Sequence, residues 1–348
     1  MKKRVGLPAL VVAMVFLFVC ANHEPALCQS KPAPGTFPPF VVMVVNAAGG
    51  TLNVLGNGLS KMISEKCPFT VKLRASSAGG LEKMVNDGDA NLSVSVSVEP
   101  YNAIRGLDNF AGEPQKKLRL VSPGPFLLVG MIVKKASPYQ SVADLKGKKV
   151  AGKYVATRPI YFDGVALLAA VNMKWEDLSV VPVATLVEGV QSLIQGRTEA
   201  AATAVGSGLV QEANASLGGV RFIGIPGDAA AAKKMWDAVP GYSPVAVKAG
   251  QALGIDKDMF LGAKDIYVNS SVDTSPAVIY EITKAMWNHM GTRHAVHPLF
   301  KEWTKESMLK TRITIPYHEG SVRFFKEVGK WTPEMEQAQN GALKILGS

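Results

Sequence analysis

The stretch VKLRASSAGGLEKMVNDGDANLSVSVS, residues 71–97, decides the fold. Two strand-like runs, Val71–Ala75 and Leu92–Val98, enclose a glycine-rich turn and a short helix over Leu81–Asn86. Strand, turn, helix and strand in this order predict a parallel α/β sheet. The turn Ser76–Gly80 precedes a helix N-terminus, where free backbone N–H groups and two hydroxyls favour an anionic group. No nucleophile or metal ligand accompanies the turn, so the stretch indicates binding of a small acid and not its conversion.

The same arrangement occurs upstream. Phe40–Val45 is a continuous apolar run, typical of a strand buried on both faces. It leads into the turn Asn46–Thr51 and then into a helix over Leu52–Glu65, which Pro68 ends. The chain therefore begins with two successive strand-to-helix turns of similar chemistry.

Alternating strands and helices continue through the middle of the chain. The pattern predicts strands over 118–123, 127–133, 179–182, 199–205 and 221–225, with helices over 160–172, 187–195 and 229–236. A short strand over 266–268 precedes helices over 276–290, 298–308 and 320–328. Residues 84–94 resemble residues 192–202, which is either a common helix-to-strand turn or the mark of two matching lobes.

The N-terminus predicts export. Lys2, Lys3 and Arg4 precede an apolar run over residues 5–19, a pattern typical of a secretory signal and short for a membrane span. We expect residues 1–30 to be a signal peptide, cleaved after Ala21 or Cys28, and residues 31–37 a flexible leader. An uncleaved anchor is the alternative interpretation.

Composition excludes several classes of protein. Cys20, Cys28 and Cys67 are the only cysteines among 348 residues, so no disulfide framework holds the fold. Three basic residues and one acid leave with the signal, and the formal net charge falls from +10 to +8. The remaining excess is scattered in isolated lysine pairs without aromatic interleaving, which favours a solvated surface over nucleic-acid binding.

These residues together resemble a known family. Gly49-Gly50, the Ser76–Gly80 turn, the Gly88–Leu92 turn and Ser141–Val150 occur in the order found in the TAXI receptors, the extracytoplasmic solute-binding proteins of TRAP transporters. Ile315–Gly320 and Trp331–Glu334 extend the resemblance, which covers nearly everything from residue 40 onwards. Each motif alone is weak, whereas their order and spacing are fairly specific.

The resemblance implies a two-lobed periplasmic-binding-protein clamshell, type II-like, with a mostly parallel sheet flanked by helices in each lobe. Residues 38–130 plus 267–348 would form lobe I, and residues 131–266 lobe II. A monomeric periplasmic protein would close on a small anionic or zwitterionic solute, such as an organic acid or amino acid, and deliver it to TRAP membrane permease subunits. No cofactor, metal or enzymatic activity is expected.

The first half of the site is expected at the two early turns. Gly49, Gly50 and Thr51 form one turn and Ser76, Ser77, Gly79 and Gly80 the other; turn geometry and helix capping are the alternative roles. The family often carries two tyrosines after the first Gly-Gly, where this chain has Leu52 and Asn53. Asn53 is a candidate polar contact or a solvent-facing helix residue. Val96 and Val98 replace the usual Gln and Asp, so the resemblance supports the general role more strongly than any particular ligand.

The second half is expected around Tyr154–Pro159, which replaces a Gly-Ser-Gly-Thr-like loop. Arg158 before Pro159 suits a first helical turn and could bind a carboxylate bidentately, or pair with a nearby acid. Thr157 belongs to the same loop. Tyr154 and Tyr161 either wall the cleft or belong to the core.

Enzymatic alternatives are weaker. Ser207 follows Gly206, but Leu209 occupies the last glycine position of the G-x-S-x-G pattern, so a cleft-lining turn is favoured. His289, His294 and His297 do not have the spacing of a metal motif. Two other classes stay open: a ligand sensor for a membrane signalling partner, and an exported enzyme on the same fold.

Overall fold

The computed structural model describes residues 37–46, 51–76, 80–293 and 295–347. The predicted signal peptide, most of the leader, and Gly49, Gly50, Ser77 and Gly79 therefore lie outside the described residues.

All strands belong to one mixed sheet in the order β2-β1-β3-β10-β4-β7-β5-β6, with β8 paired to β4 and β9 to β10. The strands are β1 (Phe40–Asn46), β2 (Thr70–Ser76), β3 (Leu92–Val96), β4 (Leu118–Lys134), β5 (Lys149–Lys153), β6 (Ser179–Val183), β7 (Ala200–Ala204), β8 (Val220–Ile223), β9 (Tyr242–Val247) and β10 (Met259–Ser271). Parallel pairs form both ends of the sheet, β1 with β2 and β3, and β5 with β6 and β7.

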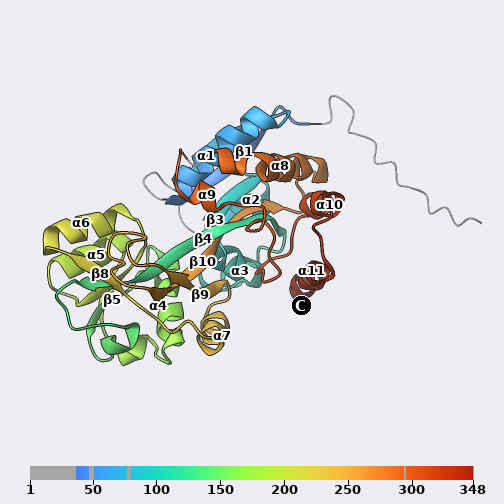
Figure 1. Cartoon of the computed structure of the whole chain (residues 1–348). Coiled ribbons are helices and arrows are strands. Elements are labelled where there is room, and N and C mark those ends of the chain that lie inside the picture. The colour runs from blue at the N-terminus through green and yellow to red at the C-terminus, as the bar shows by residue number, and fades with distance from the viewer. Residues whose placement is uncertain (1–36, 47–50, 77–79, 294, 348) are drawn as a thin grey trace, which may run out of the picture. The chain divides into compact units, whose positions relative to one another are not determined.

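Helices flank this sheet (Figure 1). The α-helices are α1 (Thr51–Lys66), α2 (Gly80–Asp87), α3 (Val98–Arg105), α4 (Arg158–Ala170), α5 (Leu186–Ile194), α6 (Gly208–Leu217), α7 (Ala229–Ala238), α8 (Pro276–His289), α9 (Leu299–Glu302), α10 (Glu319–Glu327) and α11 (Pro333–Leu346). The 3₁₀ turns are η1 (Asp108–Phe110), η2 (Val142–Leu145), η3 (Trp175–Asp177) and η4 (Met290–Arg293).

Two long antiparallel strands, β4 and β10, join two hydrophobic clusters. The first cluster contains β1, α1, α8 and α10 residues such as Met43, Leu59 and Phe325; the second contains Val150, Leu168 and Phe222. β4 contributes its first residues to the first cluster and its last residues to the second. β10 is antiparallel to it, so its first residues belong to the second cluster and its later residues to the first. The division into lobes I and II stays a prediction.

One expected break inside β4 is wrong. Two separate strands were expected over 118–123 and 127–133, yet β4 is continuous over 17 residues that include Pro123 and Pro125. The register against β10 shifts between Asp265 and Tyr267, so the prolines lie at a β-bulge. Proline is tolerated there because a residue in a bulge does not need its N–H for the hydrogen-bond ladder.

The contact between α10 and α8 gives a stability prediction. A Cβ on Gly320 would lie 2.3 Å from the Pro276 carbonyl oxygen and 2.8 Å from the Tyr280 nitrogen, both backbone atoms that cannot turn away. We expect Gly320→Ala to destabilise the fold by about 2–3 kcal/mol. Gly341→Ala in α11 is the matched control, because nothing lies within 4 Å of its Cβ, and it should be neutral or stabilise by about 0.5–1 kcal/mol. Urea unfolding measures both, and equal effects would contradict the packing argument.

Candidate functional site

The ends of β1 and β2 bring part of the predicted site together. Asn46 and Ser76 are register partners at the carboxyl ends of these parallel strands. Thr51 begins α1, and Gly80 begins α2. The Asn53 amide donates a hydrogen bond to the Asn46 carbonyl over 2.8 Å, which ties the first turn of α1 to the end of β1. The strand ends that precede the two predicted turns therefore lie at one edge of the sheet.

Three helices begin at the carboxyl ends of β5, β6 and β7, and they differ in how their N-termini are capped. In α5 the Thr185 hydroxyl accepts a hydrogen bond from the Glu188 N–H at 3.1 Å, and the Glu188 carboxylate accepts one from the Ala184 N–H at 2.8 Å. The N-cap residues of α4 and α6 are Thr157 and Ser207, and neither side chain makes a capping bond.

The uncapped ends of α4 and α6 keep free donors. Among the described residues, none accepts a hydrogen bond from the Gly208 or Leu209 N–H at the start of α6. The Thr157 Oγ1 atom at the start of α4 is buried without a partner in the described chain. Such helix ends carry positive partial charge, so they favour an anion. β7 and β5 are neighbours in the sheet, which places both ends on the same edge.

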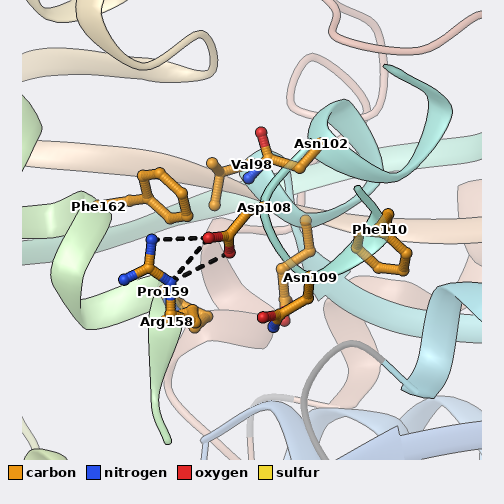
Figure 2. A pocket seen from close by; sticks show the side chains of 9 residues that line it. Val98, Asn102, Asp108, Asn109, Phe110, Arg158, Pro159 and Phe162 are labelled. Carbon is orange, nitrogen blue, oxygen red and sulfur yellow. Dashed lines mark hydrogen bonds and ion pairs between the residues drawn. The ribbon is translucent and has the colours of Figure 1, made fainter. Parts of the chain in front are cut away.

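Arg158 lies one residue beyond Thr157, and its guanidinium is held by Asp108 (Figure 2). Nη2 and Nε donate to Asp108 Oδ1 over 2.7 and 2.9 Å, and both side chains are about a fifth exposed, at 24% and 19%. Asp108 has a φ of 53°, a left-handed conformation that is uncommon outside glycine. The cavity beside the pair is about 20 Å³, which suffices for about one water and excludes an organic acid. In this conformation Arg158 pairs with an acid of its own chain.

The two candidate tyrosines differ in burial. Tyr154 is fully buried in the second cluster, because the left-handed backbone at Lys153 and Tyr154 turns the ring inward. It packs against Gly189, where a Cβ would lie 2.7 Å from the phenolic oxygen. Tyr161 stacks on Trp175 with ring centroids 5.9 Å apart. Of the two roles left open, Tyr154 therefore takes the core position. Tyr161 is half-buried, with the Arg158 guanidinium carbon 4.1 Å from its ring centre, and its place in the cleft stays a prediction.

A buried charged group beneath α4 was missed from the sequence. Lys264 Nζ lies 2.6 Å from Asp163 Oδ1, which also accepts a hydrogen bond from the Tyr242 hydroxyl at 2.8 Å. Burial and then the charge of Glu82 raise the pKa of Glu99 to about 8, while Lys264 opposes that rise. The two adjacent charged residues Lys264 and Asp265, inside the otherwise apolar run of β10, were the sequence signal for a buried charged group.

Other candidate groups have structural surroundings. Burial raises the pKa of Cys67 to about 12, which keeps the thiol protonated and unreactive. In the described ranges no cluster of His, Cys, Asp or Glu could hold a metal ion. Within the same residues no helix is both long and apolar enough for a membrane crossing. The Ser207 hydroxyl lies 3.1 Å from that of Thr203, not beside a base.

The chain is similar in structure to two solute-binding proteins of known structure. A TctC solute-binding protein from Polaromonas is 12% identical, with 90% of this chain and 99% of that chain covered and a TM-score of 0.50. The aliphatic sulphonate-binding protein SsuA from Escherichia coli is 15% identical, with 88% and 100% covered and a TM-score of 0.47. The first likeness confirms the periplasmic-binding-protein type II fold, with its mixed sheet flanked by helices.

A family model gives the stronger result. The model of the NMT1-like family matches residues 45–329, which is most of the chain and includes the ends of β1, β2, β5 and β7. The chain therefore belongs to the NMT1-like family, which corresponds to the TAXI/TRAP-type solute-binding proteins.

Proposed function

We propose that this protein is the extracytoplasmic receptor of a TRAP transporter and binds a small organic acid or amino acid between the ends of its parallel strands. The observation that carries the proposal is the contrast between α5, which caps itself, and α4 and α6, which do not. Family membership supports a solute-binding role in transport.

The free donors determine the class of solute. Gly208 and Leu209 offer N–H groups, and Thr157 offers an unpartnered hydroxyl. The Ser207 hydroxyl, which lies 3.1 Å from that of Thr203, stands beside them, and Thr51 and Ser76 add hydroxyls from the opposite strand ends. Hydroxyls and helix N-termini together match a carboxylate with further polar groups, as in a 2-oxo acid or an amino acid. Arg158 keeps its Nη1 atom unbonded within the described chain while Asp108 holds the rest of the guanidinium, so it could donate to the same carboxylate.

Closure on the solute would complete the site. In the proposed receptor, lobes I and II hinge at β4 and β10 and trap the acid between them, because a ligand shifts a protein toward the conformation that it binds more tightly. The closed form then presents the solute to a membrane permease. This role requires no chemical step by the receptor.

A thermal-shift screen tests the proposal. The panel comprises dicarboxylates, 2-oxo acids and amino acids, with their neutral amides as controls. A ligand at 100 times its Kd stabilises the folded state by about 2.7 kcal/mol, which raises Tm by several degrees. Stabilisation by one acid and not by its amide is the expected result. No shift with any small acid, measured on protein freed of retained ligand, would overturn the proposal.

Crossed variants of the capping residues separate binding from stability. We expect Thr157→Ala and Ser207→Ala to weaken binding of the solute found in the screen by about fivefold or more, with little loss of stability, because neither side chain caps its helix. Thr185→Ala should show the reverse, a loss of about 1 kcal/mol and unchanged affinity, because its hydroxyl caps α5. Titration calorimetry and urea unfolding measure the two effects. Equal affinity loss in all three variants would argue against helix-end recognition.

A further inference from the structure

A second hollow lies away from the predicted solute site. It has a volume of about 330 Å³ and opens where β4, β9 and β10 meet residues 309–312. None of the site residues predicted from the sequence lines it. Pockets for small organic ligands begin at about 300 Å³, so the space suffices for a small molecule.

Arg312 supplies an available cation at this hollow. Its guanidinium lies over the Trp236 ring, with 4.0 Å between the carbon and the ring centroid. Among the described residues, none accepts a hydrogen bond from it, and the side chain is exposed, so its donors are open to solvent. Burial lowers the pKa of Arg312 and the charges of Asp237 and Asp265 raise it. Asp237 itself is paired with Lys233.

Lys310 and Asp265 fix the inner wall. The Lys310 ammonium pairs with the Asp265 carboxylate, donates to the Gly124 carbonyl over 3.0 Å and lies 4.1 Å from the centre of the Phe126 ring. These contacts occupy Lys310, and they neutralise Asp265. Arg312 is therefore the group left to balance an incoming negative charge.

Aromatic surface gives the hollow its second property. Phe126 is 39% exposed, and Trp236 is half-buried, although both are large rings that normally seek burial. An inorganic ion would leave these rings in water, whereas an anion with an apolar or aromatic body would cover them. A planar guanidinium beside exposed rings is suited to a carboxylate attached to such a body.

We infer that this hollow is a second binding site, for a small organic anion with an apolar or aromatic body, and that Arg312 holds its carboxylate. The site is separate from the proposed solute site and does not depend on it. Its walls involve both hydrophobic clusters, because Leu309 packs against the first and Tyr242 belongs to the second. A bound anion would therefore contact both clusters beside β4 and β10.

Fluorine NMR of the full chain tests the inference with 4-fluorobenzoate as the probe. Two matched compounds separate the requirements: 4-fluorobenzamide lacks the charge, and fluoroacetate lacks the ring. We expect the chain to broaden the benzoate signal far more than the other two. Arg312→Gln should weaken benzoate binding about tenfold or more, because a charge-assisted bidentate contact is lost. Arg312 is exposed, so the variant is expected to fold.

Two control variants make the result specific. Arg323→Gln removes another guanidinium that lies over a ring, 4.4 Å from the centre of Tyr280, and should leave benzoate binding unchanged. Ser207→Ala, at the proposed solute site, should also leave it unchanged. Equal binding of the amide, undiminished binding by Arg312→Gln, or no benzoate binding by the unaltered chain would each overturn the inference. Loss with Ser207→Ala alone would place the probe at the solute site and would also overturn it.

Discussion

Replacing Lys264 with methionine is expected to destabilise the protein by about 3–5 kcal/mol, because it leaves the Asp163 carboxylate buried without its counter-charge. The lysine is 2% exposed and the aspartate 0%, so water cannot replace the lost ammonium. The Tyr242 hydroxyl still donates to Asp163, but a neutral donor does not balance a full charge. Removing Lys264 also removes the positive charge that opposes protonation of Glu99.

Urea unfolding with two further variants checks this expectation. Lys248→Met breaks an ion pair with Asp258 whose side chains are 79% and 60% exposed, and it should cost far less stability than Lys264→Met because water screens the exposed pair. Asp163→Leu combined with Lys264→Met should recover part of the loss, since no lone charge is then buried. A Lys264→Met loss as small as that of Lys248→Met would show that the buried pair does not hold α4 against β10.

Elements with a strong local pattern were predicted well from the sequence. The apolar run at residues 40–45 became β1, and the helical spacing that follows it became α1. Both elements are buried within or against the sheet, and the spacing of their apolar residues indicates this burial directly. α6 was missed because it buries only Val210 and Ala213 and so carries little periodic signal.

Tertiary contacts overrode the local pattern elsewhere. The expected helix over 298–308 is reduced to the single turn of α9, because Trp303 leaves the helical conformation and packs against Gly124. That contact joins residues 179 positions apart, so the local sequence around Trp303 does not predict it. The Pro-Gly-Pro segment of β4 was misread for a similar reason, since its partner strand β10 lies more than a hundred residues away.

The candidate site was predictable only in part. Strand ends followed by helix starts are local patterns, so Ser76 and Thr157 could be placed at such ends. Ser207 could be placed only after a strand, because α6 was missed. The hydrogen-bond partners of these residues could not be predicted. Asp108 lies fifty residues from Arg158 in the chain, and the sequence was compatible both with an intramolecular ion pair and with a ligand contact. The direction of the Tyr154 ring depends on two successive left-handed residues without glycine, which residue types do not foretell.

The second large effect concerns His318 and pH. The ring is 1% exposed and caps α10: Nδ1 accepts a hydrogen bond from the Gly320 N–H over 3.1 Å, and Nε2 lies 3.1 Å from the carbonyl oxygens of Ser271 and Thr274. Nδ1 must stay unprotonated to accept from an N–H, and burial disfavours the charged ring. Burial accordingly lowers the pKa of His318 from 6.5 to about 4.

The lowered pKa makes stability depend on pH in one direction. Between pH 6.5 and about 4 the unfolded chain binds a proton at His318 and the folded chain does not, so stability falls as pH falls. The loss reaches about 3 kcal/mol by pH 4 and stops below it. Glu99 acts with the opposite sign. Its pKa is raised from 4.5 to about 8, so over this range the folded chain binds a proton that the unfolded chain has lost, and stability falls as pH rises.

The two slopes oppose each other between about pH 4.5 and 6.5, so a difference between proteins is needed to isolate His318. Asparagine at position 318 can still accept from the Gly320 N–H and does not titrate. We expect the free energy of unfolding of the unaltered protein, minus that of His318→Asn, to fall by about 3 kcal/mol between pH 7 and 4. Urea unfolding at closely spaced pH values measures it. A difference that stays constant over this range would mean that the folded chain protonates the ring as readily as the unfolded one, and that the cap of α10 does not depend on a neutral imidazole.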